Sequence, residues 1–180
     1  MHRIEAYITL GLIFIGIIAI LYLPVLFWLK KRGLSIVRQI SYLGFISSIF
    51  LVIFATILFV PITFVPERHV LNLKPFAWIG TVDTFQAFVV EKIPNILLFV
   101  PVGIFLPIVF QRMRKLYKTA LVSFAMTFGI EFFQYFIGRS SDIDDVITNV
   151  LGAVIGYLLF WLLNRTFDSK RWWHIFMGCK

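Results

Sequence analysis

The sequence predicts an all-α integral membrane protein with five transmembrane helices. Hydrophobic residues fill 60% of the 180 positions and charged residues only 14%, which is far from the balance of a soluble domain. Five apolar stretches reach the roughly 17 to 25 residues that a helix needs to cross a hydrocarbon core about 30 Å thick. Lysines and arginines gather in every second connection between these stretches. Together these observations favour a single membrane domain over residues 1–180.

The predicted spans follow one another along the chain with one long connection. The first span is longer than the apolar part of a signal peptide and its basic residues follow it, so we expect it to remain as a helix. The connection 63–92 is rich in aromatic residues, which are typical of the bilayer interface. Asp83 and Gln86 are spaced as a capping box and predict a short interfacial helix there. The expected spans are Tyr7 to Leu29, Ile40 to Ile62, Ile93 to Phe110, Ala120 to Ile137 and Val146 to Leu163.

The basic residues predict the orientation of the bundle. Arg3, Arg68, Lys74, Lys92 and Arg139 lie on one side of the predicted bilayer, and the other 12 of the 17 lysines and arginines lie on the opposite side. Because cytoplasmic loops collect basic residues, the N-terminus is expected outside and the C-terminus in the cytoplasm. Anionic inner-leaflet lipid explains the net charge of +8, so no nucleic-acid partner is expected.

Polar side chains concentrate where the fourth and fifth spans meet, in "EFFQYFIGRSSDIDDVITNV". Charges at membrane depth usually face the bundle interior, pair with each other or line a functional cavity. Glu131 and Gln134 share one helix face, and Asp142, Asp145 and Asn149 share another at i, i+3 and i+7. A tight hairpin between the two spans would bring these faces together. The expected result is an outward-facing polar pocket.

Two further patterns near this junction concern structure. Ser141 and Asp144 have the spacing of a capping box, so Asp144 is interpreted mainly as a helix-capping residue. Gly152 and Gly156 are spaced as a small-residue pair that lets the fifth span approach a neighbouring helix closely, which makes the tight hairpin plausible. Cys179 stands alone, so neither a disulfide within the chain nor a cysteine-based metal site is expected.

These polar motifs together resemble the VanZ-like family of bacterial membrane proteins over about residues 60–163. The resemblance is carried by separate motifs in the right order: "NLKPF" at 72–76 after Arg68; then Asn95, Phe99, Pro101 and Gly103; then Glu131, Gln134, Arg139, Asp142, Asp145, Asn149, Gly152 and Gly156. The resemblance implies a multi-pass protein of the bacterial cytoplasmic membrane. It also implies a link to resistance against teicoplanin and related lipoglycopeptides in Gram-positive bacteria, or to a more general role in the cell envelope.

Three classes of function remain open from the sequence. The first is a binding or shielding protein whose outer pocket engages an envelope lipid, a lipid-linked wall precursor or a lipoglycopeptide. The second is an intramembrane enzyme acting on a lipid-linked substrate, with Glu131 as acid or base and Asp142 and Asp145 sharing protons or holding a divalent cation. The third is a transporter or proton pathway. The polar residues stop in the outer half, and this distribution argues against a pathway across the membrane. The expected ligand-binding residues are Arg68, Asn72, Asn95, Glu131, Gln134, Arg139, Asp142, Asp145 and Asn149.

Overall fold

The computed structural model describes residues 2–58, 71–76, 79 and 84–179, and its regular elements are almost all helices. Two π-helical turns, η1 and η3, adjoin α2 and α4, and a short 3-10 turn, η4, precedes α5. The strands β1 and β2 have two residues each. In chain order the elements are α1 (His2–Lys31), α2 (Ile36–Ile53), η1 (Phe54–Leu58), β1 (Leu71–Asn72), α3 (Thr84–Ala87), η3 (Phe88–Lys92), α4 (Ile93–Val109), η4 (Gln111–Met113), α5 (Leu116–Phe136), β2 (Ser141–Asp142), α6 (Ile143–Phe167) and α7 (Arg171–Met177).

Five of the described helical segments are long and apolar enough to cross a membrane, which confirms the predicted all-α membrane protein. The second to fifth spans begin three to five residues earlier than predicted, at Ile36, Phe88, Leu116 and Ile143. Their first turns carry polar residues that lower the local hydropathy, although helix geometry accepts them. The five segments are Thr9–Lys31, Ile36–Leu58, Phe88–Val109, Leu116–Phe136 and Ile143–Phe167.

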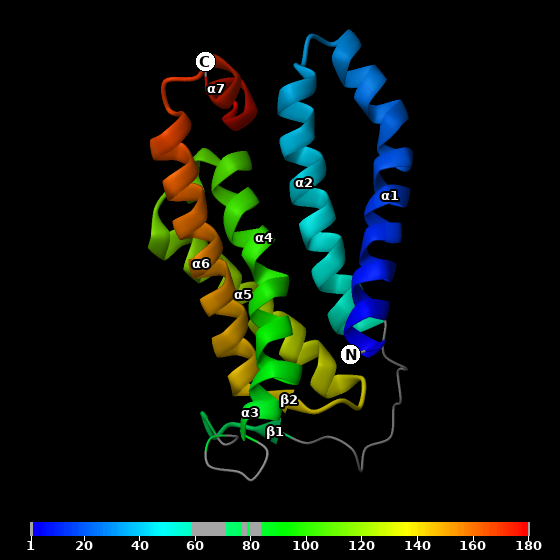
Figure 1. The fold of residues 1–180 in the computed structure, drawn as a ribbon, viewed down its shortest axis with the longest axis vertical. Helices are drawn as coiled ribbons and strands as arrows, with labels where there is room; N and C mark the ends of the chain where they lie inside the picture. The colour runs from blue at the N-terminus through cyan, green and yellow to red at the C-terminus, as the bar shows by residue number, and fades with distance from the viewer. Residues whose placement is uncertain (1, 59–70, 77–78, 80–83, 180) are drawn as a thin grey trace.

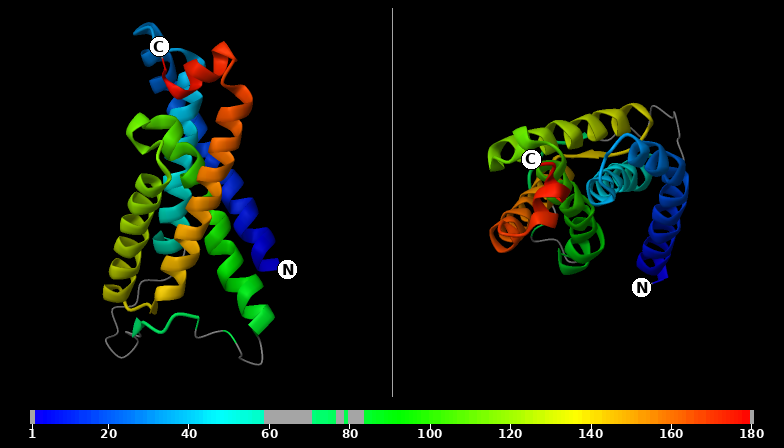
Figure 2. Two further views of the ribbon diagram at one scale, coloured as in Figure 1. Left: turned by 90° about the vertical axis from the view of Figure 1, so that its left-hand side faces the viewer. Right: turned by 90° about the horizontal axis from the view of Figure 1, so that it is seen from above.

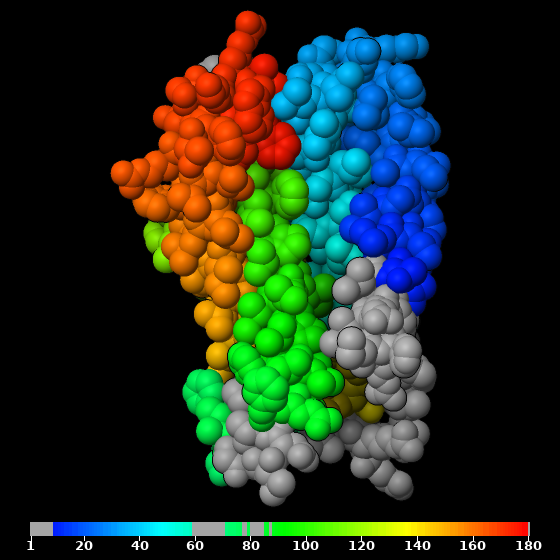
Figure 3. Space-filling model, in the orientation of Figure 1, coloured from blue at the N-terminus to red at the C-terminus, as the bar shows by residue number. Residues whose placement is uncertain are grey.

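The helix α4 lies at the centre of the bundle, between α2 and α6 (Figures 1 and 2). Side chains of α2 and α4 fill the space between their ribbons (Figure 3). Helix α5 packs mainly on α6, and α1 mainly on α2, so most of the α1 surface is left for lipid. The arrangement makes α4 and α6 the most enclosed spans.

The connections fall at two ends of the bundle. The α1–α2 and α4–α5 connections lie at the same end as α7, whereas β1, β2 and α3 lie at the opposite end (Figure 1). This arrangement agrees with the alternating basic clusters. Following the predicted orientation, we call the end with α7 the inner end and the end with the two strands the outer end. The placement of α3 at the bilayer interface stays a prediction, and Asp83, the first residue of its expected capping box, lies outside the described residues.

Glycines bring α4 and α6 into backbone contact. A Cβ atom built on Gly152 would overlap the carbonyl oxygen of Ile96, and one on Gly156 would overlap that of Val100. Gly103 of α4 makes the same kind of contact from the other helix, because a Cβ there would overlap the carbonyl oxygen of Ala153. The small-residue pair therefore faces α4, whereas the sequence interpretation used it to tighten the α5–α6 hairpin. Close backbone approach of this kind maximises packing where lipid gives no hydrophobic driving force.

Two arginines, Arg38 and Arg114, fasten α7 to the inner end, and Arg114 donates to the backbone carbonyl of Met177 at 3.0 Å and to Cys179 Sγ at 3.1 Å. Arg38 is buried in α2 and donates to the backbone carbonyls of Ile108 (3.1 Å), Val109 (2.9 Å) and Phe176 (2.8 Å). The C-terminal carbonyls of α4 and α7 lack helical partners, so one guanidinium satisfies acceptors of both helices. The predicted second span starts at Ile40, which leaves Arg38 in the preceding connection. That was wrong, because α2 starts at Ile36 and carries Arg38 into the bundle.

Candidate functional site

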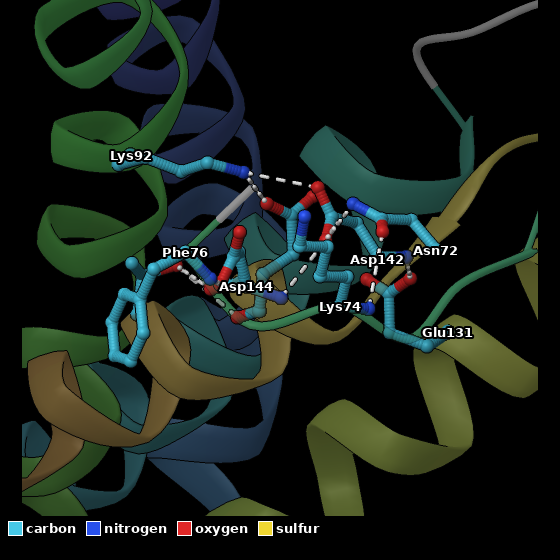
Figure 4. A network of polar contacts seen from close by, with 9 residues as sticks. Asn72, Lys74, Phe76, Lys92, Glu131, Asp142 and Asp144 are labelled. Atoms are coloured by element: carbon cyan, nitrogen blue, oxygen red, sulfur yellow. Dashed lines mark hydrogen bonds and ion pairs between the residues drawn. The ribbon is translucent and has the colours of Figure 1, made fainter. Parts of the chain in front are cut away.

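A two-residue parallel strand pair joins the long outer connection to the α5–α6 junction. Leu71 pairs with Ser141, and Asn72 pairs with Asp142. The Asn72 side-chain amide also donates to the Asp142 carboxylate at 3.2 Å. The pairing brings the "NLKPF" segment to the acidic residues that follow it by about 70 positions. Asn72, predicted as a site residue, is therefore part of this group (Figure 4).

Lys92 supplies the positive charge at the centre of the site. Its Nζ lies 2.8 Å from Asp145 Oδ1 and 3.2 Å from Asp142 Oδ2. The Lys92 side chain is only 3% exposed, whereas those of Asp145 and Asp142 are 33% and 24% exposed. An unpaired ammonium at this depth would cost several kcal/mol, so the two carboxylates stabilise its burial. We call Lys92, Glu131, Asp142 and Asp145 the outer cluster.

The turn η3 positions Lys92. This π-helical turn ends at Lys92, directly before α4, and Pro94 occupies the first turn of α4. Proline is tolerated there because the first amides of a helix have no helical acceptor. The predicted orientation used Lys92 only as one of the basic residues on the outer side. The signal that was missed is that Lys92 directly precedes an apolar span, where a charge at membrane depth requires a partner.

Asp142 organises the start of α6. It is the N-cap residue, and its carboxylate accepts from the backbone N–H of Asp144 at 2.9 Å. Its own backbone N–H donates to Glu131 Oε2 at 2.9 Å, which ties α5 to α6 across the turn. The predicted capping box was wrong, because Ser141 pairs in β2 and Asp142 takes the capping role. Glu131 itself is 5% exposed and so faces the bundle interior as expected.

Asp144 holds the outer connection in place. Its carboxylate oxygen Oδ1 accepts from the backbone N–H of Phe76 at 2.7 Å, and the residue is 2% exposed. Phe76 has a positive φ of 59°, a conformation that costs energy for a residue with a side chain. Asp144 thus stabilises the outer connection by its hydrogen bond to Phe76, and it does not form a capping box with Ser141. The two strands and this hydrogen bond fix residues 71–76 over the outer cluster.

Gln134 and Arg139 do not join the carboxylates. The Gln134 side-chain amide donates to the backbone carbonyl of Thr56 at 2.8 Å, and Arg139 Nη1 donates to the same oxygen. Thr56 lies in η1, where the π-helical turn changes the helical hydrogen-bonding pattern. The two residues therefore attach the outer end of α2 to the α5–α6 turn. Arg139 was predicted to bind ligand together with the carboxylates, whereas Lys92 is the basic residue that contacts Asp142 and Asp145.

The remaining predicted residues lie at different distances from this cluster. Asn149 is buried one turn deeper in α6, and its amide donates to Thr127 Oγ1 at 2.8 Å. Asn95 is half-buried in the first turn of α4, with no hydrogen bond to the cluster among the described residues. Arg68 lies outside the described residues. In the part of the chain that the structure describes, no three His, Cys, Asp or Glu side chains form a metal-binding group.

Comparison with known proteins places the chain in a family. The VanZ/LLP1 family profile matches residues 14–164, so the match includes the first two spans as well as the outer cluster. The chain is 33% identical over 140 residues to "Protein VanZ" of Enterococcus faecium, which covers 77% of this chain and 82% of that protein. No solved structure matches. The chain belongs to the VanZ/LLP1 family.

Proposed function

We propose that this protein resides in the bacterial cytoplasmic membrane and contributes to teicoplanin-type resistance or to envelope homeostasis. In this proposal its outer end binds or shields an envelope lipid, a lipid-linked wall precursor or a lipoglycopeptide. Membership of the VanZ/LLP1 family supports the link to resistance. The observation that carries the binding role is the convergence of β1, η3, α5 and α6 on a group of partly exposed carboxylates around one buried ammonium.

The exposure pattern supports recognition of a ligand that donates hydrogen bonds. Lys92 is almost fully buried, whereas about a quarter to a third of the Asp142 and Asp145 side chains remains exposed. A ligand approaching from outside would therefore meet carboxylate oxygens first. Sugar hydroxyls, amides and amines are donors of the required kind, and hydrogen bonds to a charged acceptor are stronger than neutral ones.

The neighbourhood of the cluster supports contact with an amphipathic ligand. Leu71, Leu73 and Phe76 are exposed on the segment that β1 and Asp144 fix over the site. An acyl chain or a hydrophobic substituent could lie against these side chains while the polar part of the same molecule reaches Asp142 and Asp145. A rigid polar site beside an apolar surface suits lipid-linked molecules and lipoglycopeptides alike.

The first test separates binding from scaffold effects. In the Glu131→Gln variant the side chain keeps its shape, but its negative charge is lost from the group that accepts the Asp142 amide. We expect loss of lipoglycopeptide resistance at near-normal protein abundance in the membrane. Glu91→Gln is the matched control, since Glu91 is exposed and lies next to Lys92. Full resistance in Glu131→Gln at normal abundance would contradict the proposal.

The second test identifies the ligand. Lipid mass spectrometry on the purified protein should reveal a co-purified envelope lipid that is lost in Asp145→Asn. The co-purified lipid is then incubated with the protein. An unchanged lipid supports binding, whereas a modified product would replace the binding proposal with an intramembrane enzyme. Absence of any enriched lipid or added lipoglycopeptide at the site would count against both.

A further inference from the structure

Buried polar side chains continue from the outer cluster towards the inner end. On α5, Thr127, Ser123 and Thr119 precede Glu131 at steps of four residues, and all three are 0% exposed. Steps of four keep side chains on one face of a helix. The expectation that polar residues stop in the outer half was therefore wrong. It rested on charged residues and amides, and it overlooked the hydroxyl groups.

Helix α6 adds polar groups along the same interface. Asn149 donates to Thr127 Oγ1 at 2.8 Å, near the outer part of the row. At the inner part, Tyr157 Oη donates to the carbonyl of Arg114 at 3.0 Å, and Thr119 Oγ1 donates to the carbonyl of Met113 at 2.7 Å. The row thus ends where η4 meets α5. We call this set the polar seam: Glu131, Thr127, Asn149, Ser123, Thr119 and Tyr157.

Among the residues that the structure describes, two atoms of the polar seam have no hydrogen-bond partner. They are Ser123 Oγ and Asn149 Oδ1, both fully enclosed by protein. An unsatisfied polar atom inside a protein usually indicates an ordered water, because leaving it without a partner costs about 1 to 3 kcal/mol. Both residues are at least nine-tenths buried, and Asn149 is already bonded to Thr127 within the seam. The seam therefore offers two buried polar atoms to which ordered water can bind.

The spacing of the seam fits one water between successive hydroxyls. Four residues of helix rise about 6 Å, and a hydrogen bond between oxygens spans about 2.8 Å. Two such bonds in sequence, hydroxyl to water to hydroxyl, cover about 5.6 Å. The helix rise over each step, from Thr119 to Ser123 and from Ser123 to Thr127, is close to that length. Asn149 Oδ1 and Ser123 Oγ supply the acceptors that hold these waters.

We propose that the polar seam holds a single file of water molecules and conducts protons between Glu131 and the inner end. A proton from the outside binds the Glu131 carboxylate, which then passes one proton to the first water. Each water or hydroxyl accepts one proton and releases another, so the chain keeps its composition while one proton leaves beside Met113 and Arg114. Carboxylates buried in membrane spans commonly serve proton relays. This activity does not depend on ligand binding at the outer cluster.

The charges around Glu131 define the outer entrance. Asp142 faces it from the start of α6 and donates its backbone amide, Asp145 lies one turn further along α6, and Lys92 bridges the two aspartates from η3. The partly exposed Asp142 and Asp145 would gather protons from outside and lead them to the more deeply buried Glu131. Among the described residues of the polar seam, Glu131 is the one carboxylate, and it lies at the outer end.

Proton flux into liposomes tests the proposal directly. The full chain is reconstituted with an internal pH-sensitive dye, and a potassium gradient with valinomycin drives protons inward. We expect wild-type acidification well above that of protein-free liposomes. Thr127→Val keeps the side-chain shape but removes the hydroxyl that accepts from Asn149, and it should slow the flux about tenfold or more, as expected for one lost buried hydrogen bond. Glu131→Gln should slow it similarly.

Controls distinguish the seam from general leakage or misfolding. Thr166→Val is the matched substitution on exposed α6 surface outside the seam, and it should leave the flux unchanged. Each variant must elute as wild type in size-exclusion chromatography, and Ser123→Ala provides a second seam variant if Thr127→Val does not. Wild-type flux at the protein-free level would overturn the proposal. Equal flux in wild type, Glu131→Gln and the seam variants would overturn it as well.

Discussion

Replacing Lys92 by methionine should destabilise the protein strongly, because the outer cluster would keep its carboxylates and lose their counter-charge. The Lys92 side chain is 3% exposed and contacts Asp145 at 2.8 Å and Asp142 at 3.2 Å. Removing one partner of a buried ion pair costs about 3 to 5 kcal/mol. Since Asp142 and Asp145 are 24% and 33% exposed, solvent screens part of this loss. We therefore expect the lower bound, about 3 kcal/mol.

A double-mutant cycle isolates the ion pair from the burial of the side chain. Asp145→Asn should cost about 1 kcal/mol, because Lys92 keeps Asp142 as a partner. The combined variant should be more stable than the sum of the two losses predicts, by about 1 kcal/mol or more. Lys74→Met is the control at the same end of the bundle. Lys74 is exposed, so its replacement should change stability by less than about 0.5 kcal/mol.

The assay is reversible unfolding of the purified full chain in mixed micelles, followed by the fluorescence of its tryptophans. The unfolding free energy is extrapolated to zero denaturing detergent for all five proteins. Additive losses in the double variant would mean that Lys92 and Asp145 do not interact. A Lys92→Met variant as stable as Lys74→Met would refute the account of the outer cluster altogether.

Four other outcomes follow from contacts described above. Gly152→Ala should lower the midpoint of thermal unfolding by about 4 to 8 °C, because overpacking against the Ile96 carbonyl costs about 2 kcal/mol. Gly129 has open space around it, so Gly129→Ala should not lower the midpoint. Equal midpoints for the two variants would contradict the α4–α6 contact. Asp144→Asn should preserve the acceptor for Phe76 and stay near wild type, while Asp144→Leu should speed proteolysis within 71–76; equal cleavage rates would exclude the loop-holding role. Arg38→Lys should loosen α7 and accelerate maleimide labelling of Cys179, because one ammonium cannot reach the carbonyls of three residues and Arg114 alone would then hold α7; unchanged labelling would mean that Arg114 suffices without Arg38. Reporters fused after Lys118 should be cytoplasmic and those inserted near Ser140 external; finding both on one side would refute the five-span topology.

The spans were predictable because their signal is additive. Roughly twenty residues contribute to each hydropathy sum, so single polar residues such as Gln134 or Asn149 hardly alter the result. The ends were less predictable, since Arg38 and Thr119 lower the sum although they belong to the helices. The relative sidedness of the connections followed from the same alternation of basic residues. The sequence therefore predicts features to which many residues contribute, such as the existence of a span, better than features that one residue decides, such as where a span begins.

The partners of individual side chains could not be predicted from spacing alone. Helical spacing predicted Asp142 and Asp145 on one helix face, whereas Asp142 is the extended N-cap residue before α6, and the spacing gave no information about which charge would face them. Lys92 reaches them because α4 lies beside α6, and that neighbour relation depends on Gly103, Gly152 and Gly156. For the same reason the sequence could not show that Arg139 attaches to η1. These contacts depend on which helices are neighbours.

The pairing of Lys92 with residues far along the chain has a consequence for biosynthesis. Lys92 leaves the ribosome 53 residues before Asp145, which at about 5 to 20 residues per second is a delay of about 3 to 10 s. During that interval the third span has an ammonium at its outer edge and no carboxylate to receive it. The nascent span must therefore wait at the headgroup region, with the lysine side chain extended to water, until α6 has been made. A chain truncated before Asp142 would keep this unpaired charge at the edge of the third span.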